Sequence, residues 1–376
     1  MAVSIKRVQS RSDLRKFVDF PNRLYKGNKY YCPKLFSDEM STLDPKKNPA
    51  SEFCDSALFL AYKDGRLAGR VAAIVNRRAN EHWKHDEVRF GWIDFIDDPE
   101  VSKALIDQVE AFGRERGMTS ITGPLGFTDF DPEGMLVEGF DKLCTMPLIY
   151  NYPYYVKHIE SLGFQKEADW LEYKIYIPRA LPEKYDRMVE IVKERYGLRM
   201  RKLTKKAVYK EGWGQKIFDL INVTYGSLYN FTNLTKGLVD KYVDTYLGLL
   251  DLKFISVVED QDANLVGFAV MMPSIVRALQ KCGGKLFPFG WWYLIRSMYT
   301  HYEENLELLL IGVTPEYQKK GVTALIITDM MKTATEGKFT YAETNAELED
   351  NSNVMTIWNG FDYDQHKRRR SYTKQL

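Results

Sequence analysis

Hydrophobic and polar positions follow the same order of patterns twice along the chain. Residues 58–75 and 254–272 each hold two β-rich runs around a polar turn, which predicts a hairpin in both places. Residues 101–117 place apolar side chains on one helical face, and residues 321–337 share their Ala-Leu-Ile triplet and closing glycine. Helical patterns precede both hairpins, and a β-rich run follows both helices. The sequence therefore predicts an α+β fold built from two similar copies.

An internal duplication accounts for the residues that match between the copies. Gly69 corresponds to Gly267 at an offset of 198 residues, whereas the Ala-Leu-Ile triplet recurs at an offset of 220 residues. The difference of 22 residues indicates an insertion in the second copy, and residues 276–299 fit it. We expect two tandem domains with mixed sheets flanked by helices.

A proline-containing stretch marks the expected boundary between the two copies. Pro178 and Pro182 lie in a segment without strong periodicity, which is typical of a linker. We therefore predict a first domain over residues 1–177 and a second over residues 178–376. A length of 376 residues is in keeping with this division.

Composition narrows the class of protein. Lys and Arg number 53 against 51 Asp and Glu, which is too even for a protein whose whole surface binds nucleic acid. The four cysteines form no CxxC pair, so we expect neither a zinc site nor a disulfide framework and favour the cytoplasm. There is no signal-peptide pattern and no apolar run of about 18 residues, so we expect no transmembrane segment.

The strand and turn before the second helix have the features of a phosphate site. The apolar run at 308–313 ends at Pro315, and a glycine follows where the helix opens. Free N–H groups at a helix N-terminus bind anions, and Gly321 lets a phosphate approach the backbone. Lys319 and Lys320 add positive potential. The alternative is a structural turn with two solvated lysines.

This segment resembles the acyl-CoA pyrophosphate loop of the GNAT acyltransferase superfamily. That loop has Gln or Arg, two free positions, Gly, one free position, and then Gly or Ala; Gln318 and Gly321 match it. Thr323 departs at the last position and Ala324 follows. The resemblance covers residues 190–376 most closely and the earlier residues by topology. It implies acetyl-CoA or another acyl-CoA as co-substrate and a small-molecule or peptide amine as acceptor.

The first copy has a different sequence at the matching positions. Asp98 and Glu100 would repel pyrophosphate, and Pro99 has no N–H group to offer. Instead they predict an ordinary helix start, with a capping residue, Pro at the first position and an acid in the first turn. We therefore assign acyl-CoA binding to the second copy alone. The acyl-CoA site predicted there comprises Ile311, Gly312, Val313, Gln318, Lys319, Lys320, Gly321, Val322, Thr323, Ala324 and Asn351.

Acyl transfer to an amine needs a base, a donor for the oxyanion, and a proton for the leaving thiolate. Glu307 is the first candidate base, because it precedes Val313 by six residues as the catalytic Glu does in the histone-acetyltransferase branch of the resembled family. Glu343 on the next strand is the second candidate. The alternative for both is a solvated strand residue. The acid is left open among Tyr363, Tyr372 and water.

Two further segments have residues that suit an acceptor or acyl-chain site. In the long loop at 123–155, the polar groups of Asp129, Asp131, Tyr150 and Asn151 could select a cationic amine; the alternative is a surface loop. The Asp-x-Asp pattern lacks the rest of a calcium loop, so no metal is expected.

The insertion holds five aromatic residues within seven positions, Trp291 among them. It predicts a lid over an acyl chain or substrate, a membrane-surface segment, or packing between the copies. We favour packing as the general role and keep Trp291 as a substrate contact. In the tail, residues 365–374 carry five basic side chains, and a solvated strand is the favoured interpretation.

Taken together, these features predict an acyl-CoA-dependent N-acyltransferase, with acetyl as the expected group and longer chains left open. One alternative is a non-catalytic CoA- or ligand-binding protein on the same scaffold. Another is a long-chain N-acyltransferase that acts at a membrane surface. A third uses charged tRNA as the donor, against which the near-neutral charge argues. We expect no nucleic-acid partner.

Overall fold

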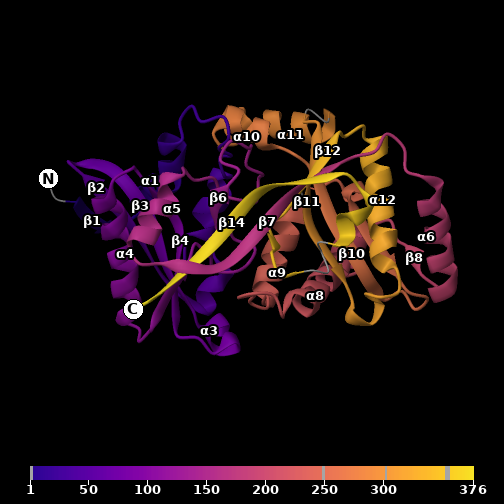
Figure 1. The fold of residues 1–376 in the computed structure, drawn as a ribbon, viewed down its shortest axis with the longest axis horizontal. Helices are drawn as coiled ribbons and strands as arrows, with labels where there is room; N and C mark the ends of the chain where they lie inside the picture. Colours follow the sequence, from indigo (N-terminus) through magenta and orange to yellow (C-terminus); the bar gives the residue numbers. More distant parts are fainter. Residues whose placement is uncertain (1–2, 248–249, 301–302, 352–355) are drawn as a thin grey trace.

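A β-sheet runs through both halves of the molecule in the computed structural model (Figure 1). The structure describes residues 3–247, 250–300, 303–351 and 356–376. Within these residues, fourteen strands form one sheet, with β6 and β13 off the main path. The order along that path is β1-β2-β3-β4-β5-β14-β7-β12-β11-β10-β9-β8. Helices flank the sheet, which confirms the predicted α+β class.

The first part of the chain forms the elements up to β7. Its strands are β1 (Val3–Arg7), β2 (Cys54–Lys63), β3 (Arg66–Asn76), β4 (Glu87–Phe95), β5 (Ser120–Gly123), β6 (Met135–Glu138) and β7 (Gln165–Tyr176). Its helices are α1 (Arg11–Leu24), α2 (Phe36–Thr42), α3 (Arg77–Trp83), α4 (Pro99–Arg114) and α5 (Tyr154–Ser161). The predicted first hairpin is β2–β3, and the predicted amphipathic helix is α4.

The second part repeats the order of hairpin, strand, helix and strand. Its strands are β8 (Arg199–Met200), β9 (Ile255–Glu259), β10 (Leu265–Pro273), β11 (Asn305–Val313), β12 (Tyr341–Thr344), β13 (Glu347–Leu348) and β14 (Tyr363–Gln375). Its helices are α6 (Glu183–Tyr196), α7 (Lys205–Lys210), α8 (Trp213–Tyr225), α9 (Lys236–Tyr242), α10 (Val276–Cys282), α11 (Gly290–Thr300) and α12 (Val322–Glu336). Short 3₁₀ or π turns lie at Pro49–Glu52, Val243–Leu247, Leu252–Phe254, Pro315–Tyr317 and Thr356–Gly360.

The two halves share one packing arrangement at the glycines that match in sequence. A Cβ atom on Gly69 of β3 would lie 2.8 Å from the Leu105 side chain of α4. A Cβ atom on Gly267 of β10 would lie 2.7 Å from the Val322 side chain of α12. Each glycine thus lets the following helix pack closely on the sheet at the corresponding place. The tandem arrangement confirms the predicted internal duplication.

The C-terminal strand joins the two halves. β14 pairs with β5, where Tyr372 lies opposite Gly123, and it pairs along most of its length with β7. β7 in turn pairs with β12, where Tyr176 lies opposite Tyr341. In Figure 1 these two strands cross the middle of the molecule. Because the sheet continues through both halves, the boundary near residue 178 stays a sequence-based prediction.

Two basic residues of β14 are buried, where the sequence favoured a solvated strand. Lys367 Nζ lies 2.9 Å from Glu172 Oε2 and 2.9 Å from Glu343 Oε2, and Arg369 Nε lies 2.6 Å from Glu172 Oε1. Burial alone would raise the pKa of Glu172, but Arg369 and Lys367 lower it to about 2. The expectation was wrong because the partner carboxylates lie on β7 and β12, which local sequence does not reveal.

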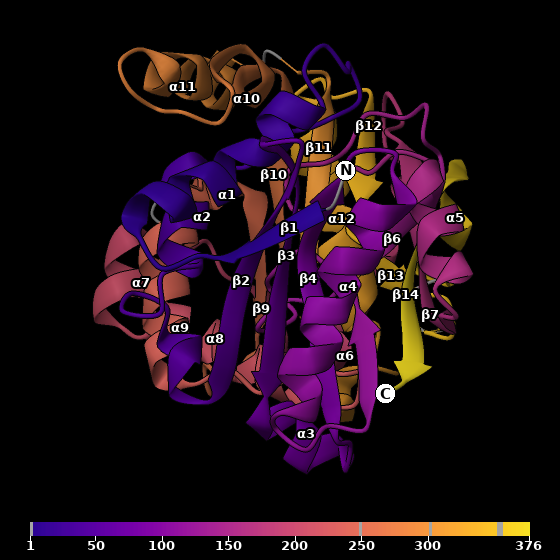
Figure 2. The same ribbon diagram turned by 90° about the vertical axis from the view of Figure 1, so that its left-hand side faces the viewer.

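The inserted segment forms two helices above one end of the sheet. Figure 2 shows α10 and α11 beside α1 and α2. The Gln280 side chain donates to the carbonyl oxygens of Lys29 and Tyr31, at 3.0 and 2.8 Å. The Phe36 N–H donates to the Gly284 carbonyl at 2.9 Å. The insertion of the second half is therefore held against the first half.

Candidate active site

A cavity of about 1230 Å³ connects the predicted acyl-CoA loop with the first half of the chain. One wall is β11, from Leu308 to Val313, and one end is the N-terminus of α12. The first half supplies residues of the 123–155 segment, and α11 supplies an apolar side. Nearly all of the predicted acyl-CoA residues line this cavity: Ile311, Gly312, Val313, Gln318, Lys319, Gly321, Thr323, Ala324 and Asn351.

Two predicted acyl-CoA residues point elsewhere. The Lys320 ammonium lies over the ring of Tyr317, 4.3 Å from its centroid. Val322 is fully buried where α12 packs on β10. The structure thus places these two side chains in packing contacts, while their neighbours face the cavity.

The N-terminus of α12 faces the cavity with a glycine cap. Gly321 is the N-cap at a φ of +82°, a conformation that suits glycine, and it has no side chain to bond the first N–H groups of the helix. Those groups and the helix dipole attract anions. Gln318 Nε2 donates to the Val313 carbonyl at 3.4 Å, which ties the loop to the end of β11. The loop therefore presents a glycine-capped helix N-terminus to the cavity, and phosphate binding there stays a prediction.

β11 and β12 separate beside this loop and leave a strand edge open. The two parallel strands pair only from Asn305 to Leu308 of β11, after which β12 ends. Beyond that point, the Tyr225 hydroxyl of α8 donates to the Ile311 carbonyl at 2.9 Å and accepts from the Ile311 N–H at 3.2 Å. Burial raises the pKa of Tyr225 to about 12, and Glu347 adds to the rise, so the hydroxyl keeps its proton. The Tyr225 hydroxyl and the Ile311 backbone thus bond each other at the open edge of β11.

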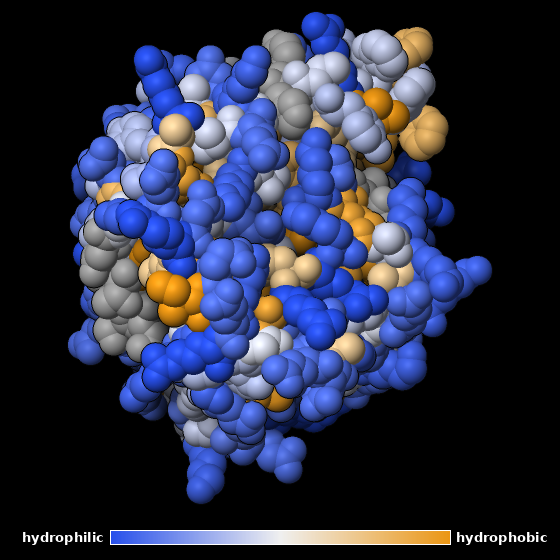
Figure 3. Space-filling view, turned by 90° about the vertical axis from the view of Figure 1, so that its right-hand side faces the viewer, coloured by the Kyte–Doolittle hydropathy of each residue, from blue (hydrophilic) through white to orange (hydrophobic). Residues whose placement is uncertain are grey.

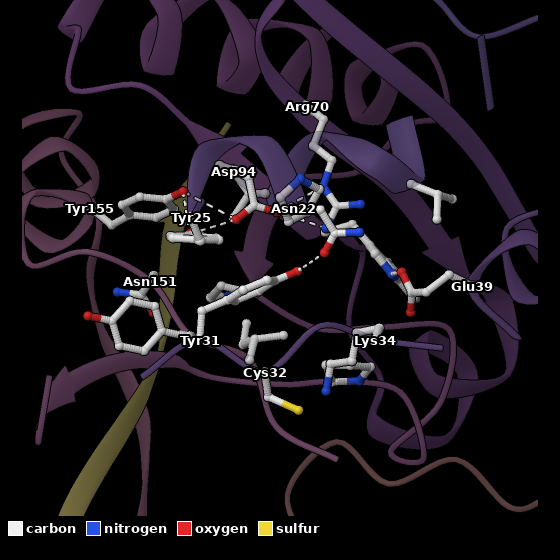
Figure 4. A pocket seen from close by; sticks show the side chains of 18 of the residues that line it. Asn22, Tyr25, Tyr31, Cys32, Lys34, Glu39, Arg70, Asp94, Asn151 and Tyr155 are labelled. Carbon is white, nitrogen blue, oxygen red and sulfur yellow. Dashed lines mark hydrogen bonds and ion pairs between the residues drawn. The ribbon is translucent and has the colours of Figure 1, made fainter. Parts of the chain in front are cut away.

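The corresponding place in the first half is filled by side chains (Figure 4). Arg70 of β3 lies opposite Asp94 of β4. The corresponding pair in the second half is Phe268 of β10 opposite Gly312 of β11. Asp94 accepts from Arg70 at 2.8 Å, and the hydroxyl of Tyr25 donates to it at 2.8 Å. The cavity that remains there is only about 40 Å³.

The matching helix N-terminus of the first half is closed as well. The Asp98 side chain caps α4 by accepting from the Glu100 N–H at 3.0 Å, with Pro99 at the first position. Both carboxylates form ion pairs with Lys63. The predicted helix start is confirmed, and this N-terminus differs from that of α12 in having its own acidic cap.

Glu307 and Glu343, the two bases predicted from the sequence, are both buried. Glu307 accepts from the Ser274 hydroxyl at 2.7 Å and from the Met146 N–H at 3.0 Å, and burial raises its pKa to about 7. Met146 lines the cavity, and Glu307 lies behind it. Glu343 faces the charge network of β14, where it accepts from Lys367.

A third carboxylate, Glu347 on β13, lines the cavity itself. Its Oε1 accepts from Trp358 Nε1 at 3.3 Å, whereas its buried Oε2 has no hydrogen-bond partner in the described part of the chain. Burial raises the pKa of Glu347 to about 8. Sequence reasoning missed Glu347 and Tyr225, because only the tertiary arrangement brings them to the open edge of β11.

The predicted acceptor residues separate into two groups. Asp129 and Asp131 line the large cavity, and burial raises their pKa values to about 6 and about 7. Asp129 accepts from the Thr232 N–H at 2.9 Å. Tyr150 and Asn151 line the small first-half cavity of Figure 4 instead. The 123–155 segment is thus no simple surface loop: it contains β6 and contributes acids to the cavity wall.

The aromatic insertion meets the cavity with one side only. Trp291, Leu294, Ile295 and Met298 of α11 line it. Several of the other aromatic side chains are exposed, with Phe287 among them. Packing between the copies, the favoured interpretation of the aromatic residues, is therefore wrong for the exposed ones. The sequence could not reveal which side of the helix would be covered.

Comparisons with known proteins place this arrangement in context. No family model matches the sequence. The chain is 28% identical to protein YghO of Escherichia coli, over 98% of this chain and 94% of that protein. It is 25% identical to a bacterial ceramide synthase of Caulobacter vibrioides, over all of this chain and 98% of that protein.

Solved structures reveal the same fold. A tandem GNAT protein from the clavulanic acid biosynthesis pathway aligns over 99% of this chain and 98% of its own, with a TM-score of 0.54 and 10% identity. A glucosamine N-acetyltransferase region of a fungal multi-domain protein aligns over 99% of this chain and 38% of its own, with a TM-score of 0.56 and 10% identity. The chain has the tandem GNAT fold, as the resemblance implied.

The described residues also bear on metal binding and membrane spanning. No group of three or more His, Cys, Asp or Glu side chains among them could hold a metal ion. No helix in the described ranges combines the length and apolarity needed to cross a bilayer. GNAT-fold proteins use acyl-CoA as co-substrate.

Proposed function

We propose that this protein is an acyl-CoA-dependent N-acyltransferase that transfers a long acyl chain to an amine. The observation that carries the proposal is the continuity of one cavity. It joins the glycine-capped N-terminus of α12, the open edge of β11, buried acids of the first half, and an apolar side under α11. A donor, a reacting centre and an acceptor thus have places in a single volume.

The apolar part of the cavity supports a donor longer than acetyl. Beyond β11 it is lined by side chains without charge, and its volume of about 1230 Å³ exceeds that of ordinary small-molecule sites. These side chains include Leu148, Met272, Ile275, Leu286, Leu294 and Met298. The name of the Caulobacter relative, a ceramide synthase, points the same way, since a ceramide is the N-acyl amide of a long-chain base.

The acids of the first half support a cationic acceptor. Asp129, Asp131 and Glu133 line the cavity, and burial raises the pKa of each. An incoming ammonium group would relieve the charge repulsion among them and favour their ionised forms. This assigns the degenerate first copy the acceptor side of the site.

The reacting groups follow from the open edge of β11. We assign the ionised form of Glu347 the proton that the neutral amine loses as it attacks, because Glu347 lines the cavity and its buried Oε2 has no hydrogen-bond partner among the described residues. The new N–C bond forms as the C–S bond breaks, and the proton passes from Glu347 to the thiolate sulfur. The Tyr225 hydroxyl would donate to the oxyanion by turning from the Ile311 carbonyl, while it goes on accepting from the Ile311 N–H. Glu307 and Glu343 stay sequence-based predictions for the base.

Thr323→Glu tests the donor site with little disturbance of the fold. A carboxylate in the first turn of α12 suits the helix dipole but repels pyrophosphate. Gly321 is a poorer target, because any side chain there would lie 2.8 Å from Val192 and strain the backbone. Thr323→Val is the matched control, since it keeps the shape and adds no charge.

The measurements are calorimetric titration with acetyl-CoA and palmitoyl-CoA, and release of free CoA thiol in the presence of long-chain amines. We expect wild type and Thr323→Val to bind the long-chain donor and release thiol, and Thr323→Glu to lose binding at least a hundredfold. Absence of binding by wild type would overturn the proposal. Binding without thiol release for any amine would make the protein a non-catalytic CoA-binding scaffold.

A further inference from the structure

Exposed aromatic side chains gather on the inserted segment of the second half. Among the described residues, seven of the exposed large hydrophobic side chains lie between positions 287 and 299: Phe287, Phe289, Trp291, Trp292, Tyr293, Ile295 and Tyr299. Phe287 is 84% exposed and Phe289 is 72% exposed. We call these seven residues the aromatic surface. So dense an apolar patch is unusual on a protein that has no partner there.

The segment that carries the aromatic surface has charges of one sign. Residues 276–300 contain Arg277, Lys281, Lys285 and Arg296 and no acidic residue. All four are exposed, and Lys285 pairs with Asp19 of α1 at 2.9 Å. Aromatic residues beside cations are the composition of segments that lie in the headgroup region of anionic membranes.

The position of the segment suits contact with a flat surface. α10 and α11 lie above the end of the sheet, beside α1 and α2 (Figure 2). In Figure 3 most of the face is hydrophilic, and hydrophobic atoms project at its upper right edge. The inserted segment therefore lies at an edge of the molecule, where a flat surface could contact it.

Two residues of the aromatic surface also line the large cavity. Trp291 is 45% exposed and Ile295 is 44% exposed, and both also line the large cavity. Leu294 and Met298, on the inner side of α11, continue the apolar lining inward. The helix thus has one side on the cavity and the other on the aromatic surface, and Trp291 and Ile295 belong to both.

We infer that the aromatic surface docks on an anionic lipid membrane and that lipid chains enter the cavity between α11 and β11. The inference rests on the proposed function only for what passes into the cavity. Phe287 and Phe289 would insert among the acyl chains, and the four basic residues would contact lipid phosphates. Docking of this kind places the substrate chain at the mouth of the site without exposing it to water.

Vesicle flotation of the full chain tests the docking. We compare vesicles of phosphatidylcholine alone with vesicles that also contain phosphatidylglycerol. Wild type should float with the anionic vesicles and much less with the neutral ones. Phe287→Ser with Phe289→Ser should weaken binding at least tenfold, and thermal unfolding should not change because both side chains are exposed. Lys281→Gln with Arg296→Gln should weaken binding about fivefold for each charge and flatten its salt dependence.

The matched control places the same change on a distant surface. Tyr209→Ser with Val223→Ser removes two exposed hydrophobic side chains from α7 and α8, and this variant should float like wild type. Equal flotation of all variants, or no flotation of wild type, would overturn the inference. So would a dimer that the two Phe substitutions abolish without any vesicle binding, because the surface would then join two copies.

The membrane docking and the proposed acyltransferase function can be tested independently of each other. Short-chain acyl-CoA affinity, measured by calorimetry on the same preparations, should be equal in wild type and in the Phe287→Ser, Phe289→Ser variant. CoA binding without vesicle binding would remove the docking and leave the proposed function. Vesicle binding without CoA binding would do the reverse.

Discussion

Replacing Glu347 with Gln should stabilise the protein increasingly as the pH rises from 5 to 8. Gln matches the protonated carboxyl in shape, can still accept from Trp358, and is neutral at every pH. In the folded chain burial raises the pKa of Glu347 from 4.5 to about 8. In the unfolded chain the carboxyl loses its proton near 4.5, so between these values only the folded state holds the proton. Wild-type stability therefore falls with rising pH in this window, and the variant lacks that loss.

The magnitude follows from the same shift. At pH 7 the group is about 2.5 pH units above its unfolded pKa, and each unit corresponds to about 1.4 kcal/mol. The variant should thus be more stable by on the order of 3 kcal/mol. An unfolding entropy of about 2 cal/mol/K per residue over this chain converts that into a rise in Tm of about 4 °C. At pH 5 the difference should be less than about 1 °C.

The assay is differential scanning calorimetry of wild type and Glu347→Gln at pH 5, 6, 7 and 8. Glu316→Gln, at an exposed position of the turn before α12, is the control and should track wild type at every pH. A Tm difference for Glu347→Gln that stays constant with pH would refute a buried, protonated Glu347. Loss of thiol release by the stabilised variant, by about a hundredfold, would support its role in proton transfer.

Two further predictions concern groups that surround the site. Tyr225→Phe should lower kcat about tenfold to a hundredfold with little change in KM, because one oxyanion donor is lost while the donor site stays intact; steady-state kinetics checks this. Lys367→Met leaves Glu172 and Glu343 without their shared cation. It should destabilise the fold by about 3–5 kcal/mol, measured as denaturant unfolding, whereas Lys374→Met, at a half-exposed pair, should lose less than about 1 kcal/mol.

The repeated fold could be predicted because its signals are local. Hairpins, one helix face and a closing glycine each lie within about 20 residues, and Gly69 and Gly267 match because each lets a helix approach the sheet. The position of the insertion followed from the change in offset between the matched hairpins and the matched helices. The candidate phosphate loop could be proposed from sequence for the same reason, since the strand, turn and glycine are contiguous, and it stays a prediction.

The buried charges of β14 and the arrangement of the candidate site depend on contacts between distant parts of the chain, which the sequence does not reveal. Lys367 and Glu172 are 195 residues apart, so the basic run of β14 gave no sign that it is neutralised inside the sheet. Glu307 was predicted from its position on the strand. The sequence could not show that Met146 of the first half lies between Glu307 and the cavity and donates its N–H to the carboxylate. Glu347 and Tyr225 become visible only once β11 and β12 separate and α8 covers the gap.

The separation of tasks between the copies gives the duplication a physical reason. The first half closes its own cleft with the Arg70–Asp94 pair and caps its own helix with Asp98, so side chains occupy the places that correspond to the proposed acyl-CoA site of the second half. The first half instead contributes Asp129 and Asp131 to the wall of the shared cavity. β14 holds the two halves in one sheet, which fixes this wall relative to β11. A single copy would have the proposed donor loop without an acceptor wall, and the pairing of β14 with β5 and β7 keeps the two halves together.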